Sequence, residues 1–280
     1  MKGPLKTVLL FIFLAAGALF FGRTVGGSQG ITAAGIVFCI VGLAAWRFSD
    51  KAVLAFHRAQ PLTEQVAPEV HAILRELSVR AGIPMPRLYL LPSAAANAFA
   101  TGRGSRHAAI AVTHGLIRLL NAEELKGVLA HELAQILDHD FIFSSIVAAW
   151  AGVLSWGSAA VLGSGRVPRS GGDGHLLAFL GIILVTPFAA ALVRMTISKA
   201  RTYREDARGG RICGEPLFLA GALKKLEVFS QKMPFREIVP GTSHLFLLSP
   251  LPGKGWMALF NTHPPVDERI LRLMSPENRI

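Results

Sequence analysis

Charged residues and cysteines are scarce in this sequence. Charged residues make up 17% of the 280 positions, whereas soluble domains average about 25%. The two cysteines, Cys39 and Cys213, are too few for a disulfide framework. The net charge is +11, but the basic residues form no consecutive block and no zinc-finger or stacked-aromatic pattern, so we expect no nucleic-acid partner. The 51% hydrophobic content excludes a disordered chain and favours contact with a membrane.

Four long apolar runs stand out against this background. They contain no Asp, Glu, Lys or Arg and cover residues 7–22, 24–46, 141–165 and 174–193. A helix needs about 20 apolar residues to cross a bilayer, so we predict four transmembrane or membrane-embedded helices in two hairpins. The first run could also be the core of a cleaved signal peptide, but no clear cleavage pattern follows it. The second hairpin could enter the bilayer only partly, because Pro187 interrupts its last run.

The basic residues beside these runs predict the orientation of the chain. They lie before the first run, after the second and after the fourth, at Lys2, Lys6, Arg47, Lys51, Arg58, Lys199, Arg201 and Arg204. Because positive residues stay on the cytoplasmic side, both polar segments should be cytoplasmic, and membrane lipid should be a partner. The chain then divides into a membrane hairpin at 1–46, a polar segment at 47–140, a second hairpin at 141–197 and a second polar segment at 198–280.

The polar segments have the periodicity of a mainly α-helical fold with a small β-sheet. Apolar spacing, capping residues and helix stops predict helices at 68–81, 121–138, 198–213, 217–230 and 266–273. Alternating side chains predict strands at 87–91 and 107–112, with a turn over 97–105 between them. Asn121 and Glu124 have the spacing of a capping box at the start of the second helix.

The second predicted helix carries part of a zinc-protease motif, in the stretch VLAHELAQILDHD at residues 128–140. Such a motif needs two histidines four residues apart, which point at one metal, and a glutamate beside the first that deprotonates the bound water. His131 and Glu132 fit the first half, but the second histidine position holds Gln135. These residues alone are also compatible with a surface pair on an ordinary helix.

Five longer motifs accompany this helix. In chain order they are RAGIPMPRLYLLPSAAANAFATGR at 80–103, HAAIAVTHGLIRLL at 107–120, EELKGVLAHEL at 123–133, ISKARTYREDARGGRICGEPLFLAGALKKLE at 197–227 and LFNTHPPVDERILRL at 259–273. Together with the two pairs of apolar runs, they resemble the HtpX family of membrane-embedded zinc metalloproteases over nearly the whole chain. The resemblance implies a zincin-like metalloprotease domain inserted among the four membrane helices, in a bacterial inner membrane with the domain in the cytoplasm.

The resemblance also implies roles at a metal site. The family's first zinc ligand falls on His131 and its general base on Glu132. The second ligand falls on Gln135, and the third, which is a glutamate in the family, falls on Thr202. Gln is a weak neutral donor and Thr is a poor zinc ligand, so we expect zinc, the family's cofactor, to bind weakly. Glu205, on the same helix face as Thr202, is the best substitute for the missing carboxylate.

Further positions match the rest of the family's cleft. Arg201 and Asp206 lie on either side of the third ligand position. We expect Asp206 to orient neighbouring groups, while Arg201 could orient nearby carboxylates or face anionic lipid. His263 could polarise a substrate carbonyl, or it could cap the last helix. The edge strand along which an extended substrate would pair matches Asn97, Ala98, Phe99 and Ala100.

Three hypotheses follow from the two missing ligands. In the first, the chain is a pseudoprotease that keeps the fold and the cleft, and binds protein or peptide segments, or regulates an active homologue, without cutting. In the second, it is an active endopeptidase that degrades misfolded membrane proteins through an altered metal site. In the third, one or both substitutions are engineered, to trap a substrate or to silence the enzyme. The loss of two separate ligands favours the first hypothesis.

Overall fold

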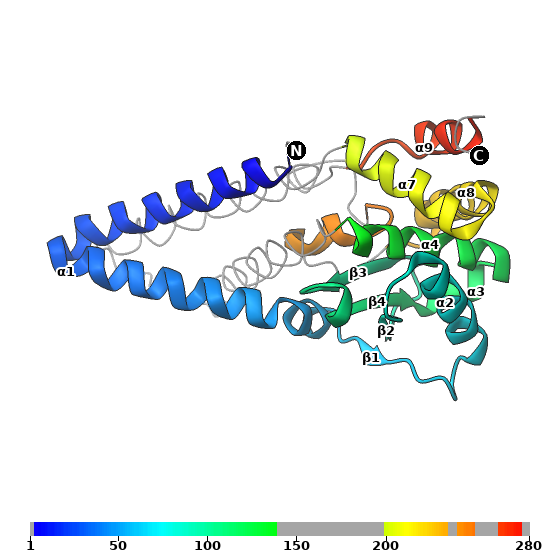
Figure 1. The fold of residues 1–280 in the computed structure, drawn as a ribbon, viewed down its shortest axis with the longest axis horizontal. Helices are drawn as coiled ribbons and strands as arrows, with labels where there is room; N and C mark the ends of the chain where they lie inside the picture. Colours follow the sequence, from blue (N-terminus) through cyan, green and yellow to red (C-terminus); the bar gives the residue numbers. More distant parts are fainter. Residues whose placement is uncertain (1–2, 139–198, 235–239, 250–262, 276–280) are drawn as a thin grey trace.

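A long helical arm and a domain of helices around a small sheet make up the structure in the computed structural model (Figure 1). The described residues are 3–138, 199–234, 240–249 and 263–275. The arm is helix α1 (Gly3–Phe56), which runs away from the domain and then returns to it. Gly27, near the middle of α1, has a φ of +57°, a left-handed conformation that glycine adopts without strain. A Cβ atom on Gly35 would lie 3.4 Å from Leu19 Cδ2, so the two halves of α1 pack against each other.

The arm contains the two apolar runs at 7–22 and 24–46, which lie in its outgoing and returning halves. Among the described residues, no helix combines the length and the apolarity that a membrane crossing requires. The runs at 141–165 and 174–193 lie outside the described residues. The four membrane helices therefore stay a prediction.

A four-stranded mixed sheet forms one layer of the domain, in the order β1-β2-β4-β3. Its strands are β1 (Gln60–Pro61), β2 (Arg87–Leu91), β3 (Ala98–Gly102) and β4 (Ala108–Thr113). β2 runs parallel to β4, whereas β1 is antiparallel to β2 and β3 is antiparallel to β4. β3 ends the order on one side, and all five of its residues are buried.

The strand predictions were correct for 87–91 and one residue early for β4. The turn predicted over 97–105 was wrong for the five residues that form β3. Three of those five residues are Ala or Gly, so their own β propensity is low, and pairing with β4 decides their conformation. Helix α3 (His114–Leu119) was not predicted; Thr113 caps it by accepting a hydrogen bond from Leu116 N.

The remaining described α-helices agree with the sequence predictions to within two residues at each end. They are α2 (Pro68–Ala81), α4 (Ala122–Leu137), α7 (Lys199–Cys213), α8 (Pro216–Lys232) and α9 (Val266–Met274). The capping box of α4 is confirmed. Asn121 Oδ1 accepts a hydrogen bond from Glu124 N at 2.8 Å, and Glu124 Oε2 accepts one from Asn121 N at 3.1 Å.

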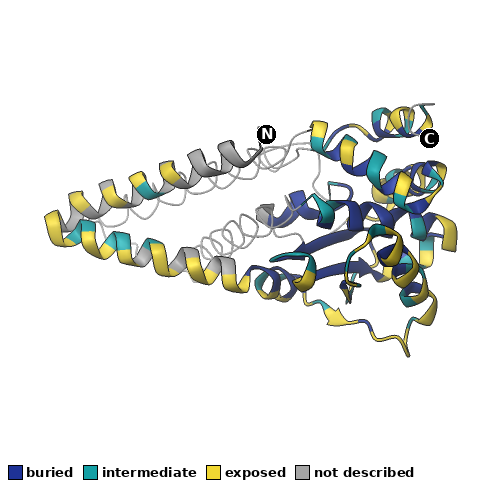
Figure 2. Cartoon of the chain, viewed as in Figure 1, coloured by how far each residue is buried: buried dark blue, intermediate teal, exposed yellow. Residues whose placement is uncertain are grey.

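Helix α4 is the central helix of the domain and packs against β3 and against α2, α7 and α8. It is largely buried, while much of α1 is exposed (Figure 2). Two glycines allow the neighbouring helices to approach closely. A Cβ atom on Gly127 would lie 2.5 Å from Leu219 N of α8, and a Cβ atom on Gly209 of α7 would lie 2.9 Å from His131 Cα. Both contacts are with main chain, so a larger residue there would push the helices apart.

Candidate functional site

His131 and Glu132 lie in the buried middle of α4, where they are 1% and 0% exposed. The close contact at Gly209 places helix α7 directly against His131. The structure therefore places the helix that carries Thr202 beside His131. The residues of α7 that are buried there are Thr202, Glu205 and Asp206.

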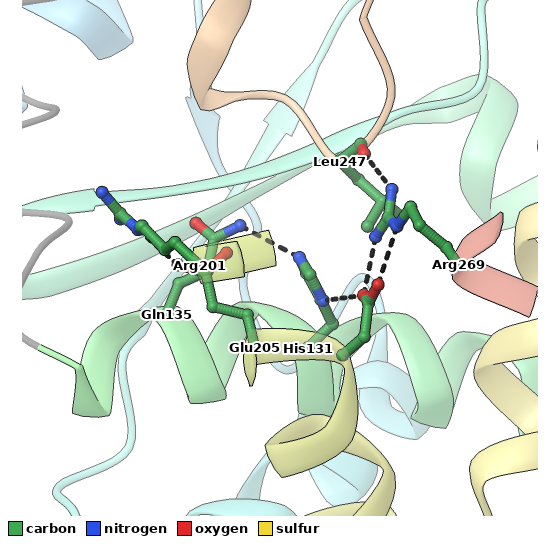
Figure 3. A network of polar contacts seen from close by, with 7 residues as sticks. His131, Gln135, Arg201, Glu205, Leu247 and Arg269 are labelled. Atoms are coloured by element: carbon green, nitrogen blue, oxygen red, sulfur yellow. Dashed lines mark hydrogen bonds and ion pairs between the residues drawn. The ribbon is translucent and has the colours of Figure 1, made fainter. Parts of the chain in front are cut away.

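Both ring nitrogens of His131 are engaged (Figure 3). Nδ1 lies 2.9 Å from Asp206 Oδ1, and Nε2 lies 3.0 Å from the side-chain nitrogen of Gln135. An ionised carboxylate can only accept, so Nδ1 carries a hydrogen, and in the neutral ring Nε2 accepts from the Gln135 amide. With Nδ1 bound to Asp206, Nε2 is the nitrogen that a metal would need. Gln135 thus occupies the position on His131 that a metal would take.

Arg269 of α9 holds Asp206 from the other side. Its Nε and Nη2 atoms donate to the two carboxyl oxygens of Asp206 at 2.8 and 2.7 Å, and the guanidinium is fully buried. Burial acts to raise the pKa of Asp206, but the charge and hydrogen bonds of Arg269 outweigh it, so this pKa lies well below its usual range. Burial acts to lower the pKa of His131, but the hydrogen bond and charge of Asp206 outweigh it, so this pKa is raised.

Glu132 is the carboxyl group with the most strongly raised pKa at the site. Burial raises the pKa of Glu132 to about 7; the charge of His131 acts against this and that of Glu205 adds to it. A carboxyl group with this pKa takes up and releases a proton near neutral pH, which is the property that a general base needs.

Arg201 and Glu205 form a partly buried ion pair beside the predicted third-ligand position (Figure 3). Arg201 Nε donates to Glu205 Oε1 at 2.7 Å, and the two side chains are 13% and 5% exposed. Thr202 lies next to this pair and is buried. Glu205, the residue predicted as a substitute ligand, is therefore held by a positive charge.

A cavity of about 30 Å³ lies between these groups. Five of the predicted site residues of α4 and α7 line it together with His263, and residues 244–247 close it; the five are His131, Gln135, Arg201, Thr202 and Glu205. Since a water molecule needs about 15 Å³ of such space, the cavity has room for one or two water molecules.

His263, which was predicted either to polarise a substrate carbonyl or to cap the last helix, lines this cavity. Helix α9 begins after Pro265 without a side-chain cap, so the structure does not support the capping role. Burial, followed by the charge of Arg269, lowers the pKa of His263 to about 3. The imidazole is therefore neutral at physiological pH.

The predicted substrate-pairing residues Asn97, Ala98, Phe99 and Ala100 lie together at the edge of the sheet, in β3 and the position before it. That edge is met by the segment after the short helix η2 (Pro240–Leu245). Phe246 forms an antiparallel bridge with Phe99. The chain's own residues thus occupy part of the edge along which a substrate was expected to pair.

The residues at this site do not fit zinc. Nε2 of His131 is hydrogen bonded to Gln135, and Thr202 offers only a hydroxyl group. Glu205 is paired with the Arg201 guanidinium, whose positive charge also disfavours a cation nearby. Catalytic zinc takes three protein ligands, yet no three His, Cys, Asp or Glu side chains in the described parts of the chain are grouped to hold a metal ion.

Two parts of the site were not predicted from the sequence. Arg269 lies inside the motif LFNTHPPVDERILRL, but its partner Asp206 is 63 residues away, and no periodicity relates them. His244 lies outside the motifs that carried the predicted site, and it lines the cavity together with the three residues that follow it. The family motif at 259–273 was the signal that could have pointed to Arg269. Residues 244–247 lie outside the five family motifs, so no such signal pointed to them.

Comparisons with known proteins agree with this architecture. Peptidase family M48 matches residues 64–277. A Protease HtpX homolog of Syntrophobacter fumaroxidans is 43% identical over 98% of this chain and 100% of its own length, and one of Thermodesulfovibrio yellowstonii is 42% identical over 98% and 99%. The crystal structure of S. mikatae Ste24p is similar with a TM-score of 0.53 at 18% identity, over 94% of this chain and 61% of that chain, which shows a shared fold. This chain therefore belongs to peptidase family M48, as a relative of the HtpX proteases.

Proposed function

We propose that this chain is an HtpX-type pseudoprotease, a membrane protein that keeps the protease fold and binds extended protein segments, or regulates an active homologue, without cleaving. The observation that carries the proposal is the contact between the Gln135 amide and His131 Nε2, at 3.0 Å. In a zinc protease this ring nitrogen binds the metal, whereas here it is hydrogen bonded to another side chain of the same chain.

The charges around the cavity support the same proposal. A zinc protease lowers the pKa of the attacking water from about 15.7 to about 7. Glu132, with a pKa of about 7, is too weak a base to deprotonate ordinary water to a useful extent. The guanidinium groups of Arg201 and Arg269 carry positive charge at the site, but a guanidinium has no open coordination position for a water molecule.

Membrane contact is part of the proposal because α1 exposes large apolar side chains. The most exposed of them are 56% to 65% accessible, and they are Ile12, Ile36, Ile40 and Leu43. Apolar side chains exposed in this number mark a surface that lipid or protein covers. With the basic residues at the ends of the apolar runs, this favours an integral protein of a bacterial inner membrane, with lipid as a partner and the domain in the cytoplasm.

A second function is supported by the raised pKa of Glu132 and by the contact between His131 and Asp206. The pKa of Glu132 is that of a general base, and His131 keeps the carboxylate partner that orients metal-binding histidines. In this alternative the chain is an active zinc endopeptidase that degrades misfolded membrane proteins. Glu205 would leave Arg201 and join His131 and Gln135 as a ligand, and His263 would polarise the substrate carbonyl.

The two functions are separated by zinc content and casein cleavage, measured on the full chain and on the double variant Gln135→His with Thr202→Glu. We expect zinc and cleavage in the double variant only, because it restores two ligands. The matched control adds Glu132→Gln to the double variant, which should keep zinc and lose cleavage. Stoichiometric zinc with chelator-sensitive cleavage in the unmodified chain would overturn the pseudoprotease proposal.

A further inference from the structure

Residues 245–248 lie along the free edge of β3 like an additional strand. Phe246 bridges Phe99 in antiparallel orientation, and Leu247 N donates a hydrogen bond to Ala98 O at 2.9 Å. This is the arrangement by which a bound peptide adds a strand to a sheet edge.

Asn97 extends the pairing beyond the end of β3. Its Nδ2 donates to Leu248 O at 2.8 Å, and its Oδ1 accepts from Leu248 N at 3.2 Å. The Asn97 side chain is buried, and both contacts use main-chain groups of the segment. Any extended peptide carries the same groups, so Asn97 can hold a peptide whatever its sequence.

The side chains of the segment supply the selectivity. The Phe246 ring packs edge-on against Phe99 at 5.1 Å and against His57 at 5.2 Å between ring centroids. The flanking residues Leu245 and Leu247 are also buried. An uncharged segment with large apolar residues fits this edge, whereas a charged side chain in place of Phe246 would be buried without a partner.

The segment also crosses the candidate site. Leu245, Phe246 and Leu247 close the cavity that His131 lines, and Arg269 Nη1 donates to Leu247 O at 2.8 Å (Figure 3). An extended substrate paired with β3 would occupy the same place.

We propose that residues 244–248, His-Leu-Phe-Leu-Leu, are an internal occupant of a peptide-binding edge, and that this edge takes extended apolar segments of other proteins when they displace it. This rests on the proposed function: extended apolar segments are the partners that the pseudoprotease would bind, and residues 244–248 would regulate their binding by competition. A partner segment competes with the chain itself, so its apparent affinity falls with the fraction of molecules in which the edge is free.

The test uses a fluorescent peptide with the sequence of residues 242–250, TSHLFLLSP, and the full chain in detergent. Binding is measured by fluorescence anisotropy for the unmodified chain and for Phe246→Ala, which weakens the internal segment and leaves β3 unchanged. We expect the Kd of Phe246→Ala to be lower by about tenfold or more, because more molecules have a free edge. A control peptide with Asp at the Phe position should not bind.

A second variant tests the same inference in case Phe246→Ala does not fold. Phe99→Cys with Phe246→Cys, in a Cys39→Ser background, places two cysteines at an antiparallel bridge, where Cα atoms lie about 4.5–5.5 Å apart and a disulfide fits. The oxidised form should bind no peptide, and reduction should restore binding. Equal binding by both forms, equal binding by the unmodified chain and Phe246→Ala, or no binding by any form would each overturn the inference.

Failure of this inference is distinguishable from failure of the proposed function. Zinc with cleavage in the unmodified chain would overturn the proposed function, whatever the peptide does. Absence of zinc and of cleavage, with peptide binding that does not depend on residues 244–248, would overturn the internal occupant alone.

Discussion

The side-chain nitrogen of Gln135 lies 3.0 Å from Nε2 of His131, one helical turn earlier on α4. Asp206 lies 2.9 Å from the other ring nitrogen and is itself held by Arg269. The imidazole is therefore part of a closed chain of polar contacts from α4 through α7 to α9. Such a chain determines the tautomer of the ring as well as its orientation.

The first prediction concerns that tautomer. In ¹⁵N NMR spectra of histidine-labelled protein at alkaline pH, neutral His131 should carry its proton on Nδ1, because Asp206 accepts from that nitrogen. Gln135→Leu should shift the Nε2 resonance and leave Nδ1 protonated. A proton on Nε2 in the unmodified chain would contradict the contact described for Gln135.

The second prediction concerns Arg269, which is buried with Asp206. Arg269→Met should lower the free energy of unfolding by about 3–5 kcal/mol, because it removes the cationic partner of the buried Asp206 carboxylate, which would keep its contact with His131. The matched control is Arg272→Met on the same helix, whose ion pair with Glu268 is exposed and should contribute under about 1 kcal/mol. Urea unfolding measures both, and equal losses would refute the role given to Arg269.

The third prediction uses two glycines on neighbouring helices. Gly209→Ala should destabilise the chain by about 1–3 kcal/mol, because its Cβ atom would meet the main chain of His131. Gly221→Ala should stabilise it by up to about 1 kcal/mol, because its Cβ atom would make ordinary contacts with the Glu124 side chain, at 3.6 Å to Oε1 and 3.9 Å to Cγ, and alanine favours a helix. Thermal unfolding should therefore move in opposite directions for the two variants; movement in the same direction would count against the close contact of α7 and α4.

The fourth prediction concerns pH. Burial lowers the pKa of His57 from 6.5 to about 4, so the unfolded chain takes up a proton in a range where the folded chain does not. The free energy of unfolding should therefore fall as pH decreases from 6.5 to 4, by up to about 3 kcal/mol, and His57 should have no such effect above that range. His57→Phe should remove this part of the pH dependence in urea titrations at pH 7 and 4.5. His107→Gln, at an exposed position, is the control and should leave it unchanged.

The five longer helices of the domain were predictable because their signals are local, whereas the six-residue helix α3 was not predicted. The ends of α2, α4, α7, α8 and α9 follow from apolar spacing, caps and stops within the helices themselves. The substitutions at Gln135 and Thr202 were equally visible, since each occupies one position of a motif.

The rest of the site depends on contacts between distant residues. Asn97 and Leu248 are 151 positions apart, and only the folded chain shows that one holds the other. The bonds that now engage the site residues, from Gln135 to His131 and from Arg201 to Glu205, depend on side-chain geometry that residue types do not reveal. The residue pattern alone predicted a turn where β3 lies, because the conformation of β3 comes from its neighbours; only the family resemblance indicated an edge strand there.

The covered edge of β3 has a consequence for how copies of this chain behave at high concentration. Open sheet edges are templates on which another chain can add a strand, and proteins that leave them open tend to aggregate. Here the opposite edge is the two-residue strand β1, whose Pro61 has no N–H to donate, while residues 245–248 cover β3. The sheet is thereby shielded on both sides, and a variant that releases residues 245–248 should also be the one that self-associates.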